Sequence, residues 1–445
     1  MTRKPSTKAD SPAPRVIVTY ARSLMSLVIA HSLGKRQIEV YGCDDVDLTV
    51  MSFSRYVKKT FVHAPLDDPD RFLDDLLAKV KKFKPNDDRP YVLMPVFRET
   101  ELIAQNRHLF EPHIRVAAPD HSSIARVHPK DHLAATAIAL GVPAPYTWTV
   151  SSGEEIDAIA PRLPYPVLIK PPDETGGRGI EVCVSQRDLR ERTRTYSFDR
   201  WKLLLIQEFA PGEDYCLTVL FERGQLKASM AYKNLRKFPP DSGAGIVRET
   251  VDDSAFLDVA RDLLGPLHWN GIAELDFRWN GSPDYPPQLI EVNPRFWAGL
   301  FQSVESGIDF PWLLYQLTVH GHAPTPRQIA IGKRTKIPGL WLLSAVRDVS
   351  NSQNRFDRVR EAWQLAWKKI ENKQIRDAFQ ILGTSLDTRS GFRETVAALR
   401  AIVQDGRSAK NDLFYRDDPF IVLGVMFILA SLIRHGKLPP EVKNR

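Results

Sequence analysis

The chain has 445 residues, of which 43% are hydrophobic and 26% charged, so we expect a globular protein of two or three domains. The net charge of +7 is not accompanied by Lys/Arg runs interleaved with aromatic residues, which argues against nucleic acid and favours an anionic substrate or membrane surface. Three cysteines without metal-binding spacing favour a reducing compartment, so a cytoplasmic location is predicted.

The first part of the chain predicts a small α/β domain. Residues 1–14 are polar, contain three prolines and lack a signal-peptide core, which predicts a disordered tail. A strand from Arg15, a helix over residues 24–33 and a strand over residues 38–43 form a βαβ unit, which predicts a parallel sheet. The alternation continues with a helix over residues 66–84, a strand over residues 91–95 and a helix over residues 100–109.

Two polar residues, Arg98 and Glu99, follow closely after the strand predicted at residues 91–95. Open α/β sheets bind ligands beyond the carboxyl ends of their strands, so these two side chains are candidate substrate contacts. The alternative is that this domain is only a packing partner for the rest of the chain.

The middle of the chain offers several parts of a phosphate site. Lys170 ends a short apolar segment that predicts a buried strand, and a lysine at a strand end is a point charge for phosphate. The glycines of the next turn, at 176, 177 and 179, allow backbone N–H groups to face an anion, although such a turn alone is usually only a turn. A second buried strand, over residues 203–206, then leads into a polar segment that suits a hinge facing adenine.

Between residues 232 and 249 the chain carries three positive charges followed by a glycine turn. Pro239, Pro240, Gly243 and Gly245 interrupt it, so we predict a lid over an acidic substrate or phosphate rather than a helix or strand. A solvated loop is the alternative.

Two further strands are predicted over residues 272–278 and 288–292, joined as a hairpin by a Gly/Pro-containing break. Pairing would bring Asp276 close to Glu291, and Asn293 would share a face with Glu291 because alternate residues of a strand point the same way. Two carboxylates and an amide oxygen suit magnesium bridged by phosphates. An ordinary hairpin with solvated charges is the alternative.

Beyond residue 330 the sequence predicts mainly helices, including segments near residues 356–370 and 395–403. Residues 419–433 carry no charge, and as a helix they would span about 22 Å, which is short of the roughly 30 Å hydrocarbon core of a bilayer. We therefore expect a buried helix. Peripheral membrane contact through residues 419–437 stays open, because Arg434, His435 and Lys437 follow directly.

The order of these parts, from the strand-end lysine to the Glu-Val-Asn-Pro-Arg run at residues 291–295, resembles the ATP-grasp superfamily over residues 121–320. The runs at residues 293–300 and 306–314 resemble its carbamoyl-phosphate-synthase-like or carboxylate-amine-ligase-like branch. The resemblance implies an α/β ATP-grasp fold. The expected parts are a tail (1–14), a Rossmann-like pre-ATP-grasp domain (15–120), the ATP-grasp domain (121–330) and a mostly helical C-terminal region (331–445).

The resemblance also implies roles for individual residues. The nucleotide would be held by Lys130, Lys170, Gly176, Gly177, Gly179, Gln207, Glu208, Phe209, Ala210 and Asp214, with Glu213 as a neighbour able to share the ribose role. The metal ligands would be Asp276, Glu291 and Asn293, and the catalytic cations would be Arg295 and Lys170. The alignment could slip by two residues to Glu274, but Asp276 is preferred because Phe277 follows it, as in the family pattern.

The implied activity is that of an ATP-dependent ligase with ATP and Mg²⁺ (or Mn²⁺) as cofactors. It would activate a small-molecule carboxylate as an acyl phosphate, which an amine or similar nucleophile then attacks. The alternatives are a kinase-like phosphotransferase and a non-catalytic nucleotide-binding scaffold. A homodimer is left open.

Overall fold

The computed structural model describes residues 12–171, 179–194, 196, 198, 202–238, 244–326, 328–337, 341, 408–412 and 415–421. They divide between two compact units. The first unit is drawn from Met1–Asn234, Arg248–Lys333 and Leu413–Arg445, and the second from Leu235–Val247 and Arg334–Asp412.

The N-terminal part of the first unit is built on a five-stranded sheet with the order β3-β2-β1-β4-β5, and its strands pair in parallel. Its strands are β1 (Arg15–Val18), β2 (Glu39–Asp44), β3 (Val57–Val62), β4 (Tyr91–Met94) and β5 (Arg115–Val116). The predicted βαβ unit and parallel sheet are thus confirmed. The edge strand β3 was missed because its side chains are exposed or only half-buried and it contains Lys58 and Lys59, as suits a protected sheet edge.

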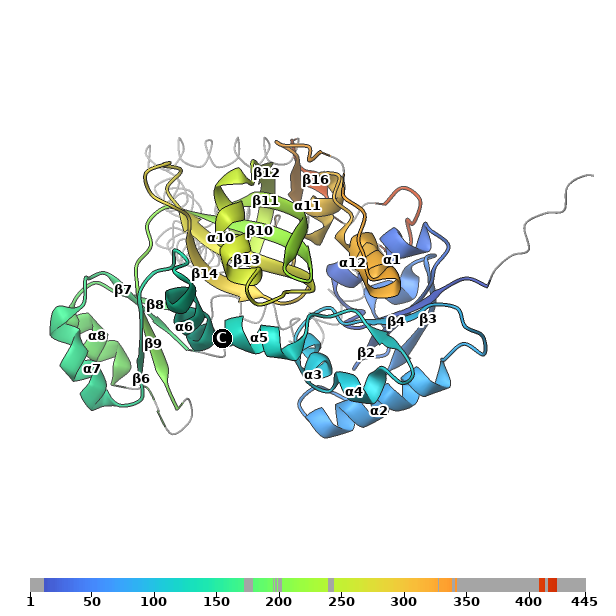
Figure 1. The fold of residues 1–445 in the computed structure, drawn as a ribbon, viewed down its shortest axis with the longest axis horizontal. Helices are drawn as coiled ribbons and strands as arrows, with labels where there is room; N and C mark the ends of the chain where they lie inside the picture. The colour runs from blue at the N-terminus through green and yellow to red at the C-terminus, as the bar shows by residue number, and fades with distance from the viewer. Residues whose placement is uncertain are drawn as a thin grey trace, which may run out of the picture. The chain divides into compact units, whose positions relative to one another are not determined.

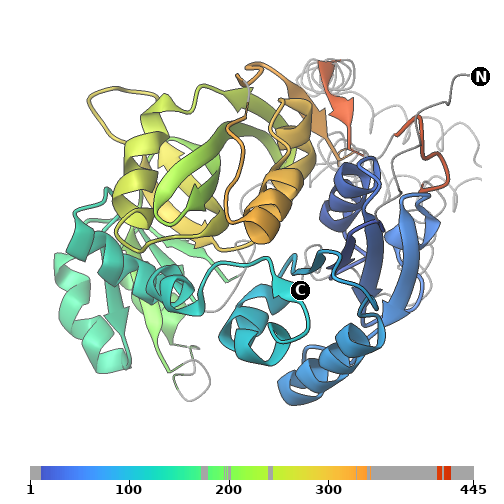
Figure 2. The same cartoon turned by 45° about the vertical axis from the view of Figure 1, so that its right-hand side comes forward.

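Helices cover both faces of this sheet (Figure 2). Val16 and Val18 cluster with α1 (Leu24–Gly34), whereas Ile17, on the opposite face, clusters with Phe72 of α2 (Pro69–Lys82). The single helix predicted at residues 100–109 is instead two short helices. These are α3 (Glu99–Gln105) and α4 (Arg107–Phe110), followed by α5 (His121–Val127) and α6 (Lys130–Leu140). The break falls at Asn106, whose side-chain amide donates to the Leu102 carbonyl and competes with helix continuation.

A four-stranded antiparallel sheet follows, with the order β6-β9-β7-β8. Its strands are β6 (Thr147–Val150), β7 (Val167–Lys170), β8 (Glu181–Cys183) and β9 (Leu204–Glu208). Helices α7 (Gly153–Ile159) and α8 (Gln186–Thr193) lie side by side on it (Figure 1), and Ile156 and Leu189 bury their side chains in its core. The buried strands predicted at 167–170 and 203–206 are confirmed.

The largest sheet has the order β14-β13-β10-β11-β12-β15-β16. Its strands are β10 (Glu213–Glu222), β11 (Gln225–Phe238), β12 (Ala244–Val251), β13 (Gly271–Trp279), β14 (Gln288–Asn293), β15 (Arg334–Lys336) and β16 (Lys410–Asn411). The predicted hairpin is confirmed, because β13 and β14 pair antiparallel with Asp276 opposite Glu291. The remaining described helices are α10 (Ser254–Leu264), α11 (Leu300–Glu305), α12 (Phe310–His320) and two 3₁₀ turns, Val50–Phe53 and Ala160–Arg162.

The predicted lid between residues 232 and 249 was wrong as a secondary-structure assignment. Strand β11 continues to Phe238 and β12 begins at Ala244, which leaves only residues 239–243 outside the described part of the chain. The two prolines that suggested a loop, Pro239 and Pro240, lie outside the described residues.

The second unit contributes the parallel pair of β15 and β16, and Ile246, Val247 and Ala409 form a small cluster against Trp341. The helices predicted near residues 356–370 and 395–403 lie outside the described residues, as does residue 422 onward of the apolar segment. Across the part of the chain that is described, no helix combines the length and the apolarity that a membrane crossing requires.

Residues 415–421 pack within the first unit, against α1 and the residues that follow the 3₁₀ turn Val50–Phe53. Asp418 is 1% exposed and accepts hydrogen bonds from the Ser54 hydroxyl and the Arg55 backbone N–H. Its Oδ2 lies 2.9 Å from Nε2 of buried His31, and the Tyr415 ring lies 3.8 Å from the His31 ring. Burial lowers the pKa of His31 to about 4, although Asp418 opposes this shift.

This histidine predicts a specific pH dependence of stability. Between pH 6.5 and about 4 the unfolded chain binds a proton at His31 that the folded chain does not, so the free energy of unfolding falls as the pH is lowered through this window. His31→Gln should flatten that part of the profile, measured by urea unfolding at pH 7, 6, 5 and 4.5. A variant profile parallel to that of the parent would contradict the buried, neutral state of His31.

Candidate active site

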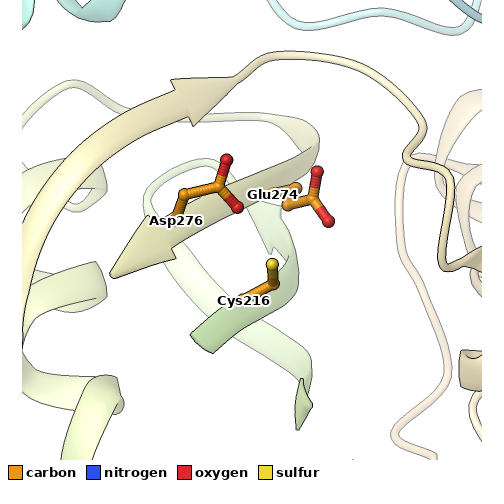
Figure 3. Close-up of side chains that lie close together, drawn as sticks. All are labelled: Cys216, Glu274 and Asp276. Atoms are coloured by element: carbon orange, nitrogen blue, oxygen red, sulfur yellow. The ribbon is translucent and has the colours of Figure 1, made fainter. Parts of the chain in front are cut away.

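The candidate site lies on one face of the largest sheet, where polar side chains form rows across neighbouring strands. Asp276 stands opposite Glu291 on one side and Cys216 on the other, and Cys216 in turn stands opposite Tyr232. Directly paired residues share a face, so these four side chains form one row. Figure 3 shows Glu274 and Asp276 projecting from β13, with Cys216 beside them on the neighbouring strand.

The three predicted metal ligands are brought together by this register. The Asn293 amide donates to Asp276 Oδ2 at 3.2 Å, and its own Oδ1 accepts a hydrogen bond of 2.8 Å from Arg295 Nη2. Glu291 Oε1 lies 3.5 Å from Lys130 Nζ, at the start of α6. Hydrogen bonds therefore join Asp276, Asn293 and Arg295, and Glu291, which is paired with Asp276 across the strands, forms an ion pair with Lys130.

The carboxylates of the site lie close together, where burial and mutual repulsion disfavour their charged forms. Burial, together with the neighbouring charges of Glu274 and Glu291, raises the pKa of Asp276 well above its usual range. Burial likewise raises the pKa of Glu274. A divalent cation at this point would offset the repulsion, and the oxygen donors present match those that Mg²⁺ takes in proteins.

Cys216 also lies within reach of such an ion, since ligand atoms of Cys216, Glu274 and Asp276 all lie within 4.8 Å of one another. Burial raises the pKa of this thiol well above its usual range, which keeps it neutral at physiological pH. A neutral thiol is a poor ligand, and sulfur suits softer metals than magnesium. The donor set therefore fits a hard cation held by oxygen.

The two acidic residues of β13 have different environments. Glu274 is buried and accepts a hydrogen bond from the hydroxyl of Tyr232. Asp276 stands opposite Glu291 and accepts from Asn293. This arrangement favours Asp276 as the partner of Glu291 and gives Glu274 a protein partner of its own.

The predicted phosphate lysine ends β7. Lys170 is 5% exposed and donates to Gln207 Oε1 on the adjacent strand β9. Burial lowers its pKa to about 8, and the charges of Lys130 and Arg278 act in the same direction, while Glu291 opposes them. Such a lysine gains more from an anionic ligand than a fully hydrated one would.

Two residues of the predicted hinge already form hydrogen bonds within the protein. The Gln207 amide donates to Thr147 Oγ1 at 2.9 Å, and the Glu208 N–H donates to the Tyr146 carbonyl at 2.9 Å. Phe209 is 41% exposed, whereas Ala210 is buried. The next turn needs glycine at position 212, where φ is +112° and a Cβ would lie 2.3 Å from the Trp279 backbone.

Two further residues that were predicted to hold the nucleotide, Asp214 and Gly179, are among the described residues. Asp214 Oδ1 accepts a hydrogen bond of 2.8 Å from Arg278 Nη1, so a ribose hydroxyl would share this carboxylate with an arginine. Gly179 has φ of +66°, and a Cβ there would lie 2.8 Å from the Pro171 side chain, so the loop end requires glycine. Gly176 and Gly177 lie outside the described residues.

The sequence did not single out Tyr232 or Cys216, which extend the row beyond the metal ligands. The only available signal was alternation along β10 and β11, and it was hidden because Tyr232 was assigned to the predicted loop. Of the two candidates after β4, Glu99 is buried and accepts from the Thr19 hydroxyl and from the N–H groups of Val96 and Phe97. Its carboxylate therefore holds the protein loop.

Comparisons with known proteins agree with the fold and the motif order. A family model described as "ATP-grasp in the biosynthetic pathway with Ter operon" matches residues 200–336. The chain is similar to the C-terminal section of the carbamoyl phosphate synthase large chain of Methanopyrus kandleri, with 25% identity over 236 residues, which are 50% of this chain and 42% of that protein. It is also 32% identical over 237 residues to the carbamoyl phosphate synthase large chain of Methanothermobacter thermautotrophicus. This match covers 50% of this chain and 21% of that protein.

Among solved structures, N5-carboxyaminoimidazole synthetase from Staphylococcus aureus, complexed with ADP, matches with a TM-score of 0.57 and 16% identity over 77% of this chain and 87% of that one. Residues 200–336 thus match an ATP-grasp family, and the chain has the ATP-grasp fold. The predicted resemblance and the ATP-grasp fold are thereby confirmed. The matched part of the chain spans less than half the length of the curated relatives reported above.

The register of β13 and β14 leads to a test of the predicted metal ligands. We expect Asp276→Asn and Glu291→Gln to weaken binding of Mn²⁺, a paramagnetic substitute for Mg²⁺, by about tenfold or more, because each removes a charged oxygen ligand. Glu274→Gln is the matched control on the same strand and should change the affinity less than about threefold, because its partner is Tyr232. Electron paramagnetic resonance titration measures free Mn²⁺, and the reverse order would move the assignment by two residues.

Proposed function

We propose that this protein is an ATP-dependent ligase that activates a carboxylate as an acyl phosphate for attack by an amine or similar nucleophile. The observation that carries the proposal is the network of Asp276, Glu291 and Asn293 with Arg295 and Lys130 on an ATP-grasp sheet. Two similar proteins are named carbamoyl phosphate synthase large chains, and these names support the same reaction class for this chain.

In the first step, a carboxylate oxygen would bond to the terminal phosphorus of ATP while the bond to the ADP oxygen breaks. The attacking carboxylate, the transferred phosphoryl group and the departing ADP all carry negative charge in this step. Positive charge near the phosphoryl group therefore lowers the barrier. Magnesium held by Asp276, Glu291 and Asn293 would supply part of that charge. Lys130 and Arg295, which already contact Glu291 and Asn293, would supply the rest from the protein.

In the second step, the amine nitrogen would bond to the carbonyl carbon of the acyl phosphate, phosphate would leave, and the nitrogen would lose a proton. This displacement needs no nucleophilic Ser or Cys of the protein. Cys216, the one thiol in the row, is buried with its pKa raised, in keeping with a structural role.

The nucleotide would lie against the four-stranded sheet. Lys170 at the end of β7 and the glycine loop that ends at Gly179 would face the phosphates. Gln207, Glu208 and Phe209 would border the adenine. Within that segment the exposed ring of Phe209 offers an apolar face for a base, whereas the polar atoms of Gln207 already have protein partners.

The reaction class is tested by a screen of carboxylate and amine pairs for coupled release of ADP and phosphate. The proposal predicts release that depends on both partners and a product mass equal to the sum of the two, less one water. ADP formation with the carboxylate alone and a stable phosphorylated product would indicate a kinase. Nucleotide binding without turnover under any pair would indicate a scaffold.

Lys170 provides a direct test of the nucleotide site. Lys170→Ala should weaken ADP binding by about 10- to 100-fold, because a charge-assisted hydrogen bond to phosphate contributes on the order of 1.5–3 kcal/mol. The matched control is Lys227→Ala, which removes a lysine near the start of β11, on the other sheet, beside Glu222. Calorimetry gives both affinities, and equal ADP affinity in the Lys170 variant and the parent would remove Lys170 from the site.

A further inference from the structure

The loops after β1 and β4 lie at the point where the strand order of the N-terminal sheet reverses. In the order β3-β2-β1-β4-β5 the chain leaves β1 toward β2 and later returns to β4 on the other side. The carboxyl ends of these two parallel strands lie at the same sheet edge, the usual location of function in open α/β sheets. Each strand is followed here by an aromatic residue, Tyr20 after β1 and Phe97 after β4.

These rings form a continuous stack that ends on the candidate catalytic arginine. The guanidinium carbon of Arg295 lies 4.5 Å from the centre of the Phe97 ring. Phe97 stacks on Tyr20, with ring centres 5.0 Å apart and an angle of 13° between the planes. On the far side, Arg22 lies 5.8 Å from the Tyr20 ring centre. An arginine over an aromatic face is attracted by about 0.5–2 kcal/mol, depending on how far it is desolvated.

Both ends of the stack are anchored. Arg22 Nε donates to Asp44 Oδ1 at 2.8 Å, and the Arg22 N–H donates to Asp44 Oδ2 at 2.8 Å. At the other end, Arg295 Nη2 donates to Asn293 and Nη1 donates to the Phe296 carbonyl at 2.9 Å. The guanidinium therefore has two in-plane partners and one aromatic face.

The loop that carries Phe97 is itself held by a buried carboxylate. Glu99 is 7% exposed, and its Oε1 accepts from the N–H groups of Val96 and Phe97 at 3.1 Å each. The same oxygen accepts from the hydroxyl of Thr19, which directly precedes Tyr20. One side chain thus fixes the backbone under both rings, which explains why a carboxylate is buried at this sheet edge.

We propose that Phe97 is a positioning residue for Arg295. Its ring, backed by Tyr20 and by the loop that Glu99 holds, keeps the guanidinium plane against Asn293, so that the charge is in place before phosphoryl transfer. The role in turnover rests on the proposed ligase function, whereas the contact itself does not. A preorganised charge needs no reorganisation during the reaction, so losing the ring should affect kcat more than substrate binding.

The contact is tested first without turnover, by NMR of the arginine Nε–H groups in the full chain. A proton near an aromatic face is shifted upfield. The Arg295 signal, assigned by its absence in Arg295→Lys, should therefore lie upfield of the usual range for arginines that face no aromatic ring. Phe97→Leu should remove that shift and Phe97→Trp should keep one. An Arg295 signal without an upfield shift in the parent would overturn the proposal, whatever the enzyme does.

The kinetic test uses the substrate pair found by the screen. Phe97→Leu should lower kcat by about 2- to 30-fold with KM for ATP changed less than about threefold, and Phe97→Trp should recover most of the loss. Phe83→Leu is the matched control, because Lys59 Nζ lies 4.8 Å from the centre of the Phe83 ring, and none of the described contacts joins this ring to Arg295. Tyr20→Leu removes only the backing ring and should lower kcat less.

The outcomes separate this inference from the proposed function. A parent that turns over no pair rejects the ligase, while the NMR result still decides the contact. A parent that turns over, with Phe97→Leu matching its kcat, rejects the positioning role. Equal losses in Phe97→Leu and Phe83→Leu would assign the effect to general destabilisation and also reject it.

Discussion

The placement of Asp276 directly opposite Glu291 is the constraint on which the rest of the site depends. Like charges in directly opposed positions weaken a strand pair, so the hairpin must be held by other contacts. The opposite face supplies them: Leu275 stands opposite Val292, and both side chains are fully buried. The alternation of the strands thus separates a stabilising apolar face from a polar face that costs stability and serves the chemistry.

That division explains much of what the sequence could predict. The strand pattern and the spacing of Asp276, Glu291 and Asn293 identified the hairpin, its register and the order of motifs, because period-two alternation is local information. Lys170 was likewise recognised at the end of an apolar strand. The predicted parallel sheet followed from alternating strand and helix patterns, which are also local.

The features that the sequence did not predict either lack an apolar pattern or depend on contacts between distant parts of the chain. Strand β3 is an edge strand with exposed lysines, so it lacks the apolar signal of a buried strand. The segment around Tyr232 and Lys233 resembled a loop because of its charges and the following prolines, but pairing with β10 decided its structure. The contact of Phe97 with Arg295 joins residues far apart in the chain, and no local pattern encodes such a contact.

The electrostatics of the site suggest how its two expected ligands would depend on each other. Burial raises the pKa values of Glu274 and Asp276, and burial lowers the pKa of Lys170 to about 8. A polyphosphate alone would satisfy the lysine but would bring more negative charge toward Glu291. A divalent cation alone would satisfy the carboxylates but would add repulsion for Lys130, which lies 3.5 Å from Glu291. Only a cation and a polyphosphate together offset both costs, so each should raise the affinity for the other by the same factor.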